Sequence, residues 1–211
     1  MICFNQDRWN LLCSFAGFPA TFGQCFEGLR NRYSEAHRHY HNSQHIDECL
    51  QEFERARLEA ENPVALELAI WFHDVIYDPR RSDNEERSAQ FAGECLNAAD
   101  DLRQRICELI LTTKTHLPGT VRDAALLIDI DLTIFGKSEM RFREYENAIR
   151  AEYAWVPESV YREKRAEILR RFLKRERIYQ TATFFDLYEK SARQNISNSI
   201  AAVKTQDGLA L

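Results

Sequence analysis

A histidine followed directly by an aspartate ends an apolar stretch in the first half of the chain. The stretch runs from Leu66 to Phe72, and His73 and Asp74 come next. Such a run predicts a helix that enters the core, where an unpaired carboxylate costs on the order of several kcal/mol. A divalent metal ion is one suitable partner, because it binds neutral imidazole nitrogen and carboxylate oxygen together. An ordinary structural contact between the two side chains is the alternative.

A second histidine is expected on an inward helix face upstream. His45 lies four positions before Cys49, so the two share a face of the predicted helix. That face carries an apolar stripe at helical spacing, made by Ile46, Cys49, Leu50 and Phe53. His45 therefore points toward the same core as the histidine 28 positions later (73 minus 45).

Two aspartates occupy an equally apolar setting downstream. Asp129 and Asp131 alternate with Ile128, Ile130 and Leu132. Carboxylates in such surroundings need a partner, and a metal ion bound by two histidines is one. Either aspartate could complete a set made of two imidazoles and two carboxylates, which balances the charge of a divalent ion.

The elements that must position these residues are helices. The 211 residues include only 7 glycines and 5 prolines, and alternating strand patterns are nearly absent, so we expect an all-α fold. Helix caps are expected at Asn42 or Ser43, at Asn62 before Pro63, and at Asp83 with Glu86 as a capping box. Apolar spacing and breakers predict helices at 7–17, 19–35, 43–53, 62–78 (stopped by Pro79), from 84, 101–113, 121–135 (ended by Gly136), 141–152, 158–177 and 182–200.

The net charge, the cysteines and the lengths of the apolar runs limit the classes of protein to which the chain can belong. A net charge of −5 gives no indication of a nucleic-acid polymer as partner. The six cysteines contain no CxxC spacing and read as free thiols in a reducing compartment. With no export signal or membrane-length apolar run, we expect a cytoplasmic protein that is not bound to a membrane. The composition leaves the oligomeric state open.

The order His, His-Asp, Asp in an all-α chain resembles the HD-domain superfamily of metal-dependent phosphohydrolases. We expect one domain over 1–211, because no linker composition interrupts the chain, and a domain boundary near Ser138 is the alternative. The resemblance implies an HD-type helical bundle with its core at about 33–136 and additional C-terminal helices at about 138–200. The chain is also similar to an uncharacterised bacterial subgroup of predicted HD phosphohydrolases. The matching segments are 40–46, 72–78, 84–89, 129–132, 165–172 and 189–195.

The resemblance implies a set of metal ligands. They are His45, His73, Asp74 and a late aspartate, for which Asp131 is favoured because a leucine follows it, as is typical of the family. Asp129 would then orient a ligand or hold a water. Mixed nitrogen and oxygen ligation suits Mn, Fe, Co, Ni or Zn better than Mg alone.

The resemblance also implies a reaction, the hydrolysis of a phosphate ester by a metal-activated water. The substrate class would be a nucleotide or another small phosphorylated metabolite. Some HD enzymes place an acidic residue three positions after the aspartate, where this chain has Tyr77. Glu85 is therefore the first candidate for the general base, and Asp78 is the second.

Four further residues are weaker candidates. His41, four positions before His45, and His116, after a helix end, are candidates for a second metal ion or for orienting a ligand. Lys114 and Arg38 are candidates for contacts to the phosphate.

Two rival hypotheses remain at this point. The first is a non-catalytic HD module that keeps a metal ion and binds a nucleotide or a protein partner without turnover. The second is a helical interaction protein in which the histidines and aspartates form a buried structural network. Metal content separates the second rival from the others, and turnover of phosphate esters separates the first from an enzyme.

Overall fold

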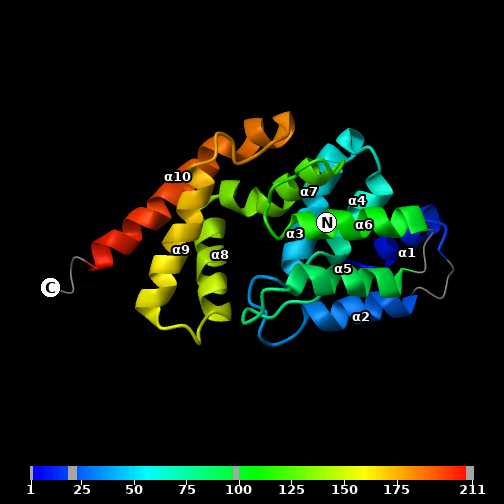
Figure 1. Cartoon of the computed structure of the whole chain (residues 1–211), viewed down its shortest axis with the longest axis horizontal. Helices are drawn as coiled ribbons and strands as arrows, with labels where there is room; N and C mark the ends of the chain where they lie inside the picture. Colours follow the sequence, from blue (N-terminus) through cyan, green and yellow to red (C-terminus); the bar gives the residue numbers. More distant parts are fainter. Residues whose placement is uncertain (1, 19–22, 97–99, 208–211) are drawn as a thin grey trace. The chain divides into compact units, whose positions relative to one another are not determined.

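The regular elements of this protein are helices throughout the described residues, which are 2–18, 23–96 and 100–207 of a computed structural model (Figure 1). The predicted all-α fold class is confirmed. Residues 1–131 and 132–211 form two compact units, described separately below. The assignment of the whole chain to one domain stays a prediction. A helix start at Pro19 lies outside the described residues.

The first unit is organised around helix α4, which has a neighbour on every side. It packs against five other helices, and all its residues from 65 to 72 are buried. Those neighbours are α1 (Gln6–Phe15), α3 (Ser43–Ala56), α5 (Asn84–Cys95), α6 (Asp100–Thr112) and α7 (Ala124–Asp131) around α4 (Pro63–Phe72). This enclosure explains why the α4 sequence is mostly apolar rather than amphipathic. Its one charged side chain, Glu67, is buried and pairs with Arg8 and Arg57. The unit also contains α2 (Gly23–Tyr33) and the short 3-10 helix η2 (Arg57–Glu59).

The start of α4 matches the prediction, but its end does not. Asn62 caps the helix by accepting a hydrogen bond from the backbone of Ala65, and Pro63 occupies the first turn. The helix ends at Phe72, not near Pro79, so the prediction of a longer helix is wrong. The reason is that the backbone of the following turn bonds to side chains instead, including the Ser88 hydroxyl, which contacts both the amide and the carbonyl of Ile76. His73 and Asp74 therefore lie in a turn directly after the helix.

The capping box predicted for α5 is also wrong. Asp83 occupies the N-cap position, but its side chain caps no backbone amide of the helix. Its carboxylate instead accepts hydrogen bonds from the Arg81 guanidinium, at 2.7 and 2.6 Å. A charged donor two residues away has displaced the weaker backbone partner.

The predicted helix 121–135 is shorter and divided. Its α-helical part, α7, begins after Asp123, whose φ of +62° lies outside the helical region. The Asp123 carboxylate accepts hydrogen bonds from the backbone amides of Glu61 and Asn62, at 2.8 and 2.9 Å. After Asp131 the chain continues as the 3-10 helix η3 (Leu132–Gly136).

The second unit begins with η3 and contains α8 (Glu139–Glu152), α9 (Glu158–Leu173) and α10 (Ala182–Asp207). Two side chains, one just before α10 and one on it, donate hydrogen bonds to backbone carbonyls of η3. The Tyr179 hydroxyl donates to the Leu132 carbonyl and the Asn195 amide to the Phe135 carbonyl, both at 2.8 Å. These partners replace the i to i+4 bonds of a continued α-helix. Helix α9 ends at Leu173 rather than at the predicted residue 177, because the Arg193 guanidinium binds the carbonyls that follow.

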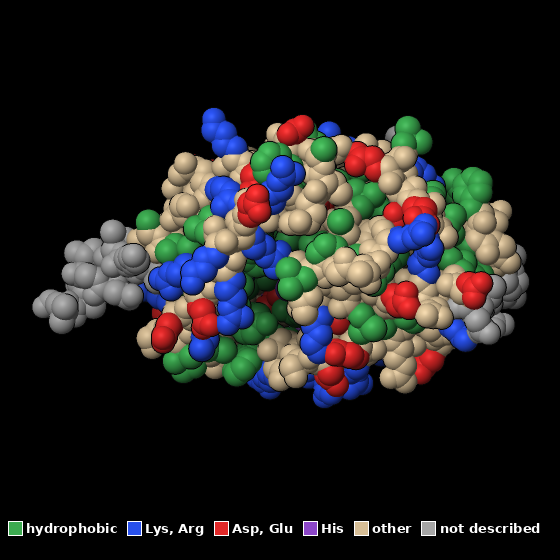
Figure 2. All heavy atoms as spheres, turned by 45° about the horizontal axis from the view of Figure 1, so that its top comes forward, with side chains coloured by type: hydrophobic (Ala, Val, Ile, Leu, Met, Phe, Trp, Pro, Cys, Tyr) green, Lys and Arg blue, Asp and Glu red, His purple; other side chains and the backbone are tan. Residues whose placement is uncertain are grey.

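Charged side chains of both signs share the face shown in Figure 2. Helices of the second unit also carry local ion pairs, such as Arg143 with Glu139 and Arg162 with Glu158. Pairs as exposed as Arg143 and Glu139 contribute at most about 1 kcal/mol each. In the described part of the chain, no helix is both long and apolar enough to cross a membrane.

Gly136 generates a stability prediction for the second unit. A Cβ atom at this position would lie 2.5 Å from Cβ of Tyr188 on α10, so the Gly136→Ala variant has to move one element away from the other. We expect it to lower the free energy of unfolding by about 1–3 kcal/mol, measured by chemical denaturation. The matched control is Gly28→Ala, whose added Cβ meets nothing closer than 3.9 Å. As a glycine in a helix interior, Gly28 should tolerate alanine or gain stability by up to about 1 kcal/mol.

Candidate metal centre

Four side chains from three parts of the first unit converge in its core. His45 comes from the first turn of α3, His73 and Asp74 from the turn after α4, and Asp131 from the last position of α7. The Nε2 atoms of His45 and His73 lie 3.2 Å apart. From His45 Nε2, an Asp74 oxygen lies at 3.4 Å and an Asp131 oxygen at 3.2 Å. From His73 Nε2, the corresponding distances are 3.2 and 3.7 Å.

These separations fit ligands of one divalent ion. Two ligand atoms, each about 2.1 Å from a metal, lie about 3.0 Å apart on an octahedral edge and about 3.4 Å apart on a tetrahedral one. The five distances, 3.2 to 3.7 Å, are close to that range. The donor chemistry also fits, because two neutral imidazoles and two carboxylates match the charge of a divalent ion.

The imidazole of His73 is held in the form that a metal requires. Its Nδ1 atom lies 2.9 Å from the carbonyl oxygen of Ile70, which can only accept a hydrogen bond. Nδ1 therefore donates a hydrogen bond to this carbonyl, and Nε2 is the nitrogen that faces the cluster and can bind a metal ion once it has lost its proton. Metal-binding histidines are commonly oriented by such a partner.

The electrostatics of the cluster favour positive charge between the carboxylates. Burial acts to raise the pKa of Asp74, but the His73 and His41 imidazoles and a hydrogen bond from His45 hold that pKa well below its ordinary value. The same holds for the pKa of Asp131. Burial acts to raise it, but hydrogen bonds from His116, His45 and His73 hold it well below its ordinary value. Both shifts favour the ionised carboxylates in this largely buried setting, and a bound cation would stabilise them further.

The structure separates the two late aspartates. Asp131 belongs to the cluster, whereas Asp129 is fully buried and belongs to none of the potential ligand groups among the described residues. Residues two apart on a helix point to nearly opposite faces. The geometry therefore favours Asp131 as the ligand.

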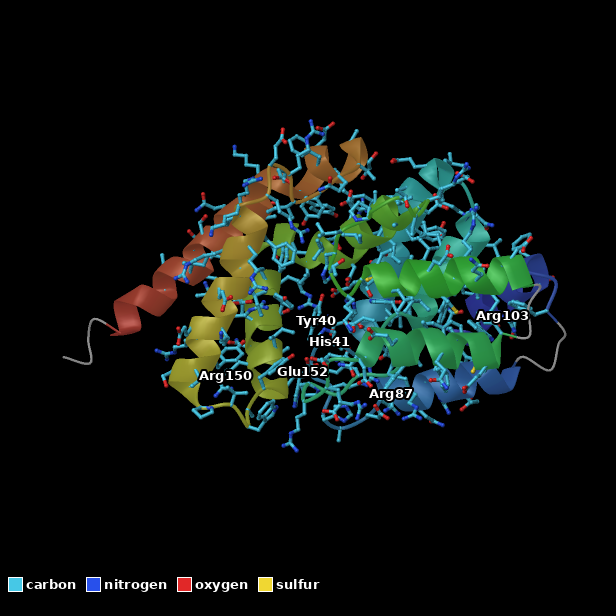
Figure 3. The ribbon with its side chains drawn as sticks, viewed as in Figure 1. Tyr40, His41, Arg87, Arg103, Arg150 and Glu152 are labelled. Atoms are coloured by element: carbon cyan, nitrogen blue, oxygen red, sulfur yellow. The ribbon has the colours of Figure 1, made fainter. Side chains whose placement is uncertain are left out.

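His116 contacts the outer oxygen of Asp131. Its Nε2 lies 3.0 Å from Oδ2, while Oδ1 of the same carboxylate faces the other two histidines. His116 has a φ of +50°, a strained conformation for a residue other than glycine. This contact is suited to orienting Asp131. His41, which is labelled in Figure 3, belongs to neither potential ligand group among the described residues. Its ring is stacked on that of Tyr77 at a centroid distance of 4.0 Å and lies 6.1 Å from the ring of His45.

The two candidates for the general base differ in their surroundings. Glu85, in the first turn of α5, is half-buried, and burial together with the nearby Asp74 carboxylate raises its pKa. Asp78 instead accepts a hydrogen bond from the backbone of Arg80 at 2.9 Å, which uses its carboxylate to hold a loop. The Glu85 carboxyl thus interacts electrostatically with Asp74, whereas the Asp78 carboxylate holds the backbone of its own loop.

The geometry does not support a phosphate contact at Arg38. Its guanidinium is 0% exposed and donates to the carbonyls of His41, Asp74 and Val75, as well as to Glu35. Arg38 thus positions the turn that carries Asp74. Lys114 is exposed and bonds to the Ser82 carbonyl and the Glu86 carboxylate, which ties the end of α6 to the loop before α5.

One residue beside the cluster had no predicted role. Cys49 is buried one turn after His45 on α3, and its sulfur belongs to a second potential ligand group with His45 and Asp131. The i, i+4 spacing from His45 was the available signal in the sequence.

No protein-family model, curated protein or solved structure matches this chain.

The two aspartates of α7 provide a direct test of the ligand set. We expect Asp131→Asn to weaken divalent-metal binding by more than about 100-fold, since loss of a partner that only orients a ligand already costs about 10–100-fold. The matched variant, Asp129→Asn, should weaken metal binding by less than about 100-fold, because Asp129 would at most orient a ligand. Metal content by elemental analysis and affinity by competitive chelation provide the measurement. A reversed order of the two effects would assign the ligand to Asp129.

The role of Arg38 generates a separate prediction. Arg38→Ala leaves three carbonyls without their donor, and we expect a loss of about 2–4 kcal/mol in the free energy of unfolding. The control is Arg32→Ala, because Arg32 also pairs with Glu35 but is exposed, so its loss should cost less than about 0.5 kcal/mol. Equal effects of the two variants would contradict a positioning role for Arg38.

Proposed function

We propose that this protein is a metal-dependent phosphohydrolase that acts on a nucleotide or another small phosphorylated metabolite. The observation that carries the proposal is the convergence of His45, His73, Asp74 and Asp131 at ligand-to-ligand distances of 3.2 to 3.7 Å. The resemblance of their order to the HD-domain superfamily supports phosphate-ester hydrolysis as the reaction class.

The four residues would hold one divalent ion through the two Nε2 atoms and two carboxylates. When bound, such an ion polarises a phosphoryl oxygen and lowers the pKa of a coordinated water. His73 stays in the correct tautomer through its bond to the Ile70 carbonyl, and His116 holds the outer oxygen of Asp131. The protein thereby keeps the ligands in place without reorganisation during the reaction.

Glu85 would accept the proton of the attacking water. Its pKa is raised by burial and by Asp74, which brings the carboxyl closer to the neutral range in which a general base works best. The side chain is half-buried and so remains partly accessible to solvent.

Metal content and turnover together test this function. Wild type, Asp74→Asn and Glu85→Gln are assayed on a panel of nucleotides and simple phosphate esters with Mn²⁺, Co²⁺, Ni²⁺ and Mg²⁺. We expect Asp74→Asn to lose both metal and turnover, because it removes a ligand. Glu85→Gln should keep its metal and lose about 10²- to 10⁴-fold in kcat, the usual contribution of a general base.

The control for Glu85 is its neighbour. Glu86→Gln removes an exposed carboxylate that pairs with Lys114, and its turnover should match wild type. A wild-type protein that holds metal but turns over no ester would favour the non-catalytic binding module. A wild-type protein without affinity for divalent ions would contradict the metal centre itself and favour a structural network.

A further inference from the structure

A buried thiol lies against the candidate metal centre. Cys49 is 2% exposed, and its Sγ atom lies 3.7 Å from Nδ1 and 3.9 Å from Nε2 of His45. Ligand atoms of Cys49, His45 and Asp131 all lie within 4.8 Å of one another. The sulfur thus flanks the His45 ring and faces a carboxylate of the same cluster.

The separations are compatible with a shared ion. A thiolate binds Zn²⁺ at about 2.3 Å and an imidazole at about 2.0–2.1 Å, so the two donor atoms can lie at most about 4.4 Å apart. The observed 3.9 Å between Sγ and Nε2 is within this limit. The position of Cys49 is also secure, because α3 carries it on the same buried face as His45.

We propose that Cys49 is a further ligand of the candidate metal centre and makes it selective for Zn²⁺ or Co²⁺ over Mg²⁺ and Mn²⁺. The inference rests on the metal site of the proposed function. On binding, the S–H bond breaks, its proton passes to solvent, and the sulfur lone pair forms a bond to the ion without any change of oxidation state. A thiolate favours the softer ions, whereas carboxylate and water favour Mg²⁺ and Mn²⁺.

Cobalt substitution distinguishes a bound sulfur from a neighbouring one. Co²⁺ shows visible d–d bands at any protein site, but a sulfur-to-cobalt charge-transfer band in the near ultraviolet requires a bond to sulfur. We expect wild type to show both, and Cys49→Ser and Cys49→Ala to lose the charge-transfer band. The matched control is Cys13→Ser, which replaces another buried cysteine, on α1, and should keep it.

Metal affinities give a second readout. Cys49→Ser should weaken Zn²⁺ binding by at least about 10-fold and leave Mn²⁺ binding within about threefold. If wild type binds Co²⁺ with d–d bands but no charge-transfer band, Cys49 is not a ligand, and the metal site of the proposed function stands. If wild type binds no Co²⁺ or Zn²⁺, both the inference and the proposed metal site fail. The wild-type spectrum decides between these outcomes even if a variant folds poorly.

Discussion

The Arg38 guanidinium holds the backbone on which the candidate site depends. Through bonds of 2.7 to 2.9 Å it satisfies the carbonyls of Asp74, Val75 and His41, and its charge is balanced by Glu35. The chain after α4 must leave the helix here, and the carbonyls released would otherwise be buried without donors. A single rigid donor group thus joins the segment before α3 to the turn after α4. The first of these segments leads into α3, which carries His45, and the second carries His73.

Within the cluster, burial and the neighbouring charges have opposite effects on ionisation. Burial disfavours charge on each member, yet the carboxylates remain ionised because imidazoles surround them. The histidines are correspondingly easy to protonate, with pKa values above the ordinary range despite burial. Such a site is stable with protons on the imidazoles or with a cation in their place, and the second state would link metal binding to proton release. The Ile70 carbonyl and His116 restrict the orientation of the ligands in either state.

Much of the architecture was predictable from local rules. The all-α class, the Asn62 cap and the apolar composition of α4 follow from spacing and helix chemistry. The wrong predictions have a common cause, which is a hydrogen bond from a side chain that local patterns do not reveal. Arg81 occupies the carboxylate of Asp83, Ser88 binds the backbone after α4, and Tyr179 binds the backbone after Asp131. Local propensity is weak compared with a buried hydrogen bond, so tertiary partners override it.

The candidate site, too, was predictable from the sequence only in part. The sequence by itself determined which residues carry ligand chemistry, that His45 belongs to an inward helix face, and that His73 and Asp74 directly follow a buried helix, because apolar periodicity is a local property. Only the tertiary structure decided that Asp131 rather than Asp129 joins the cluster, that Arg38 binds carbonyls, and that the helix face shared by His45 and Cys49 lies against Asp131. These outcomes depend on how helices rotate and pack against one another, and no pattern within a single helix specifies that.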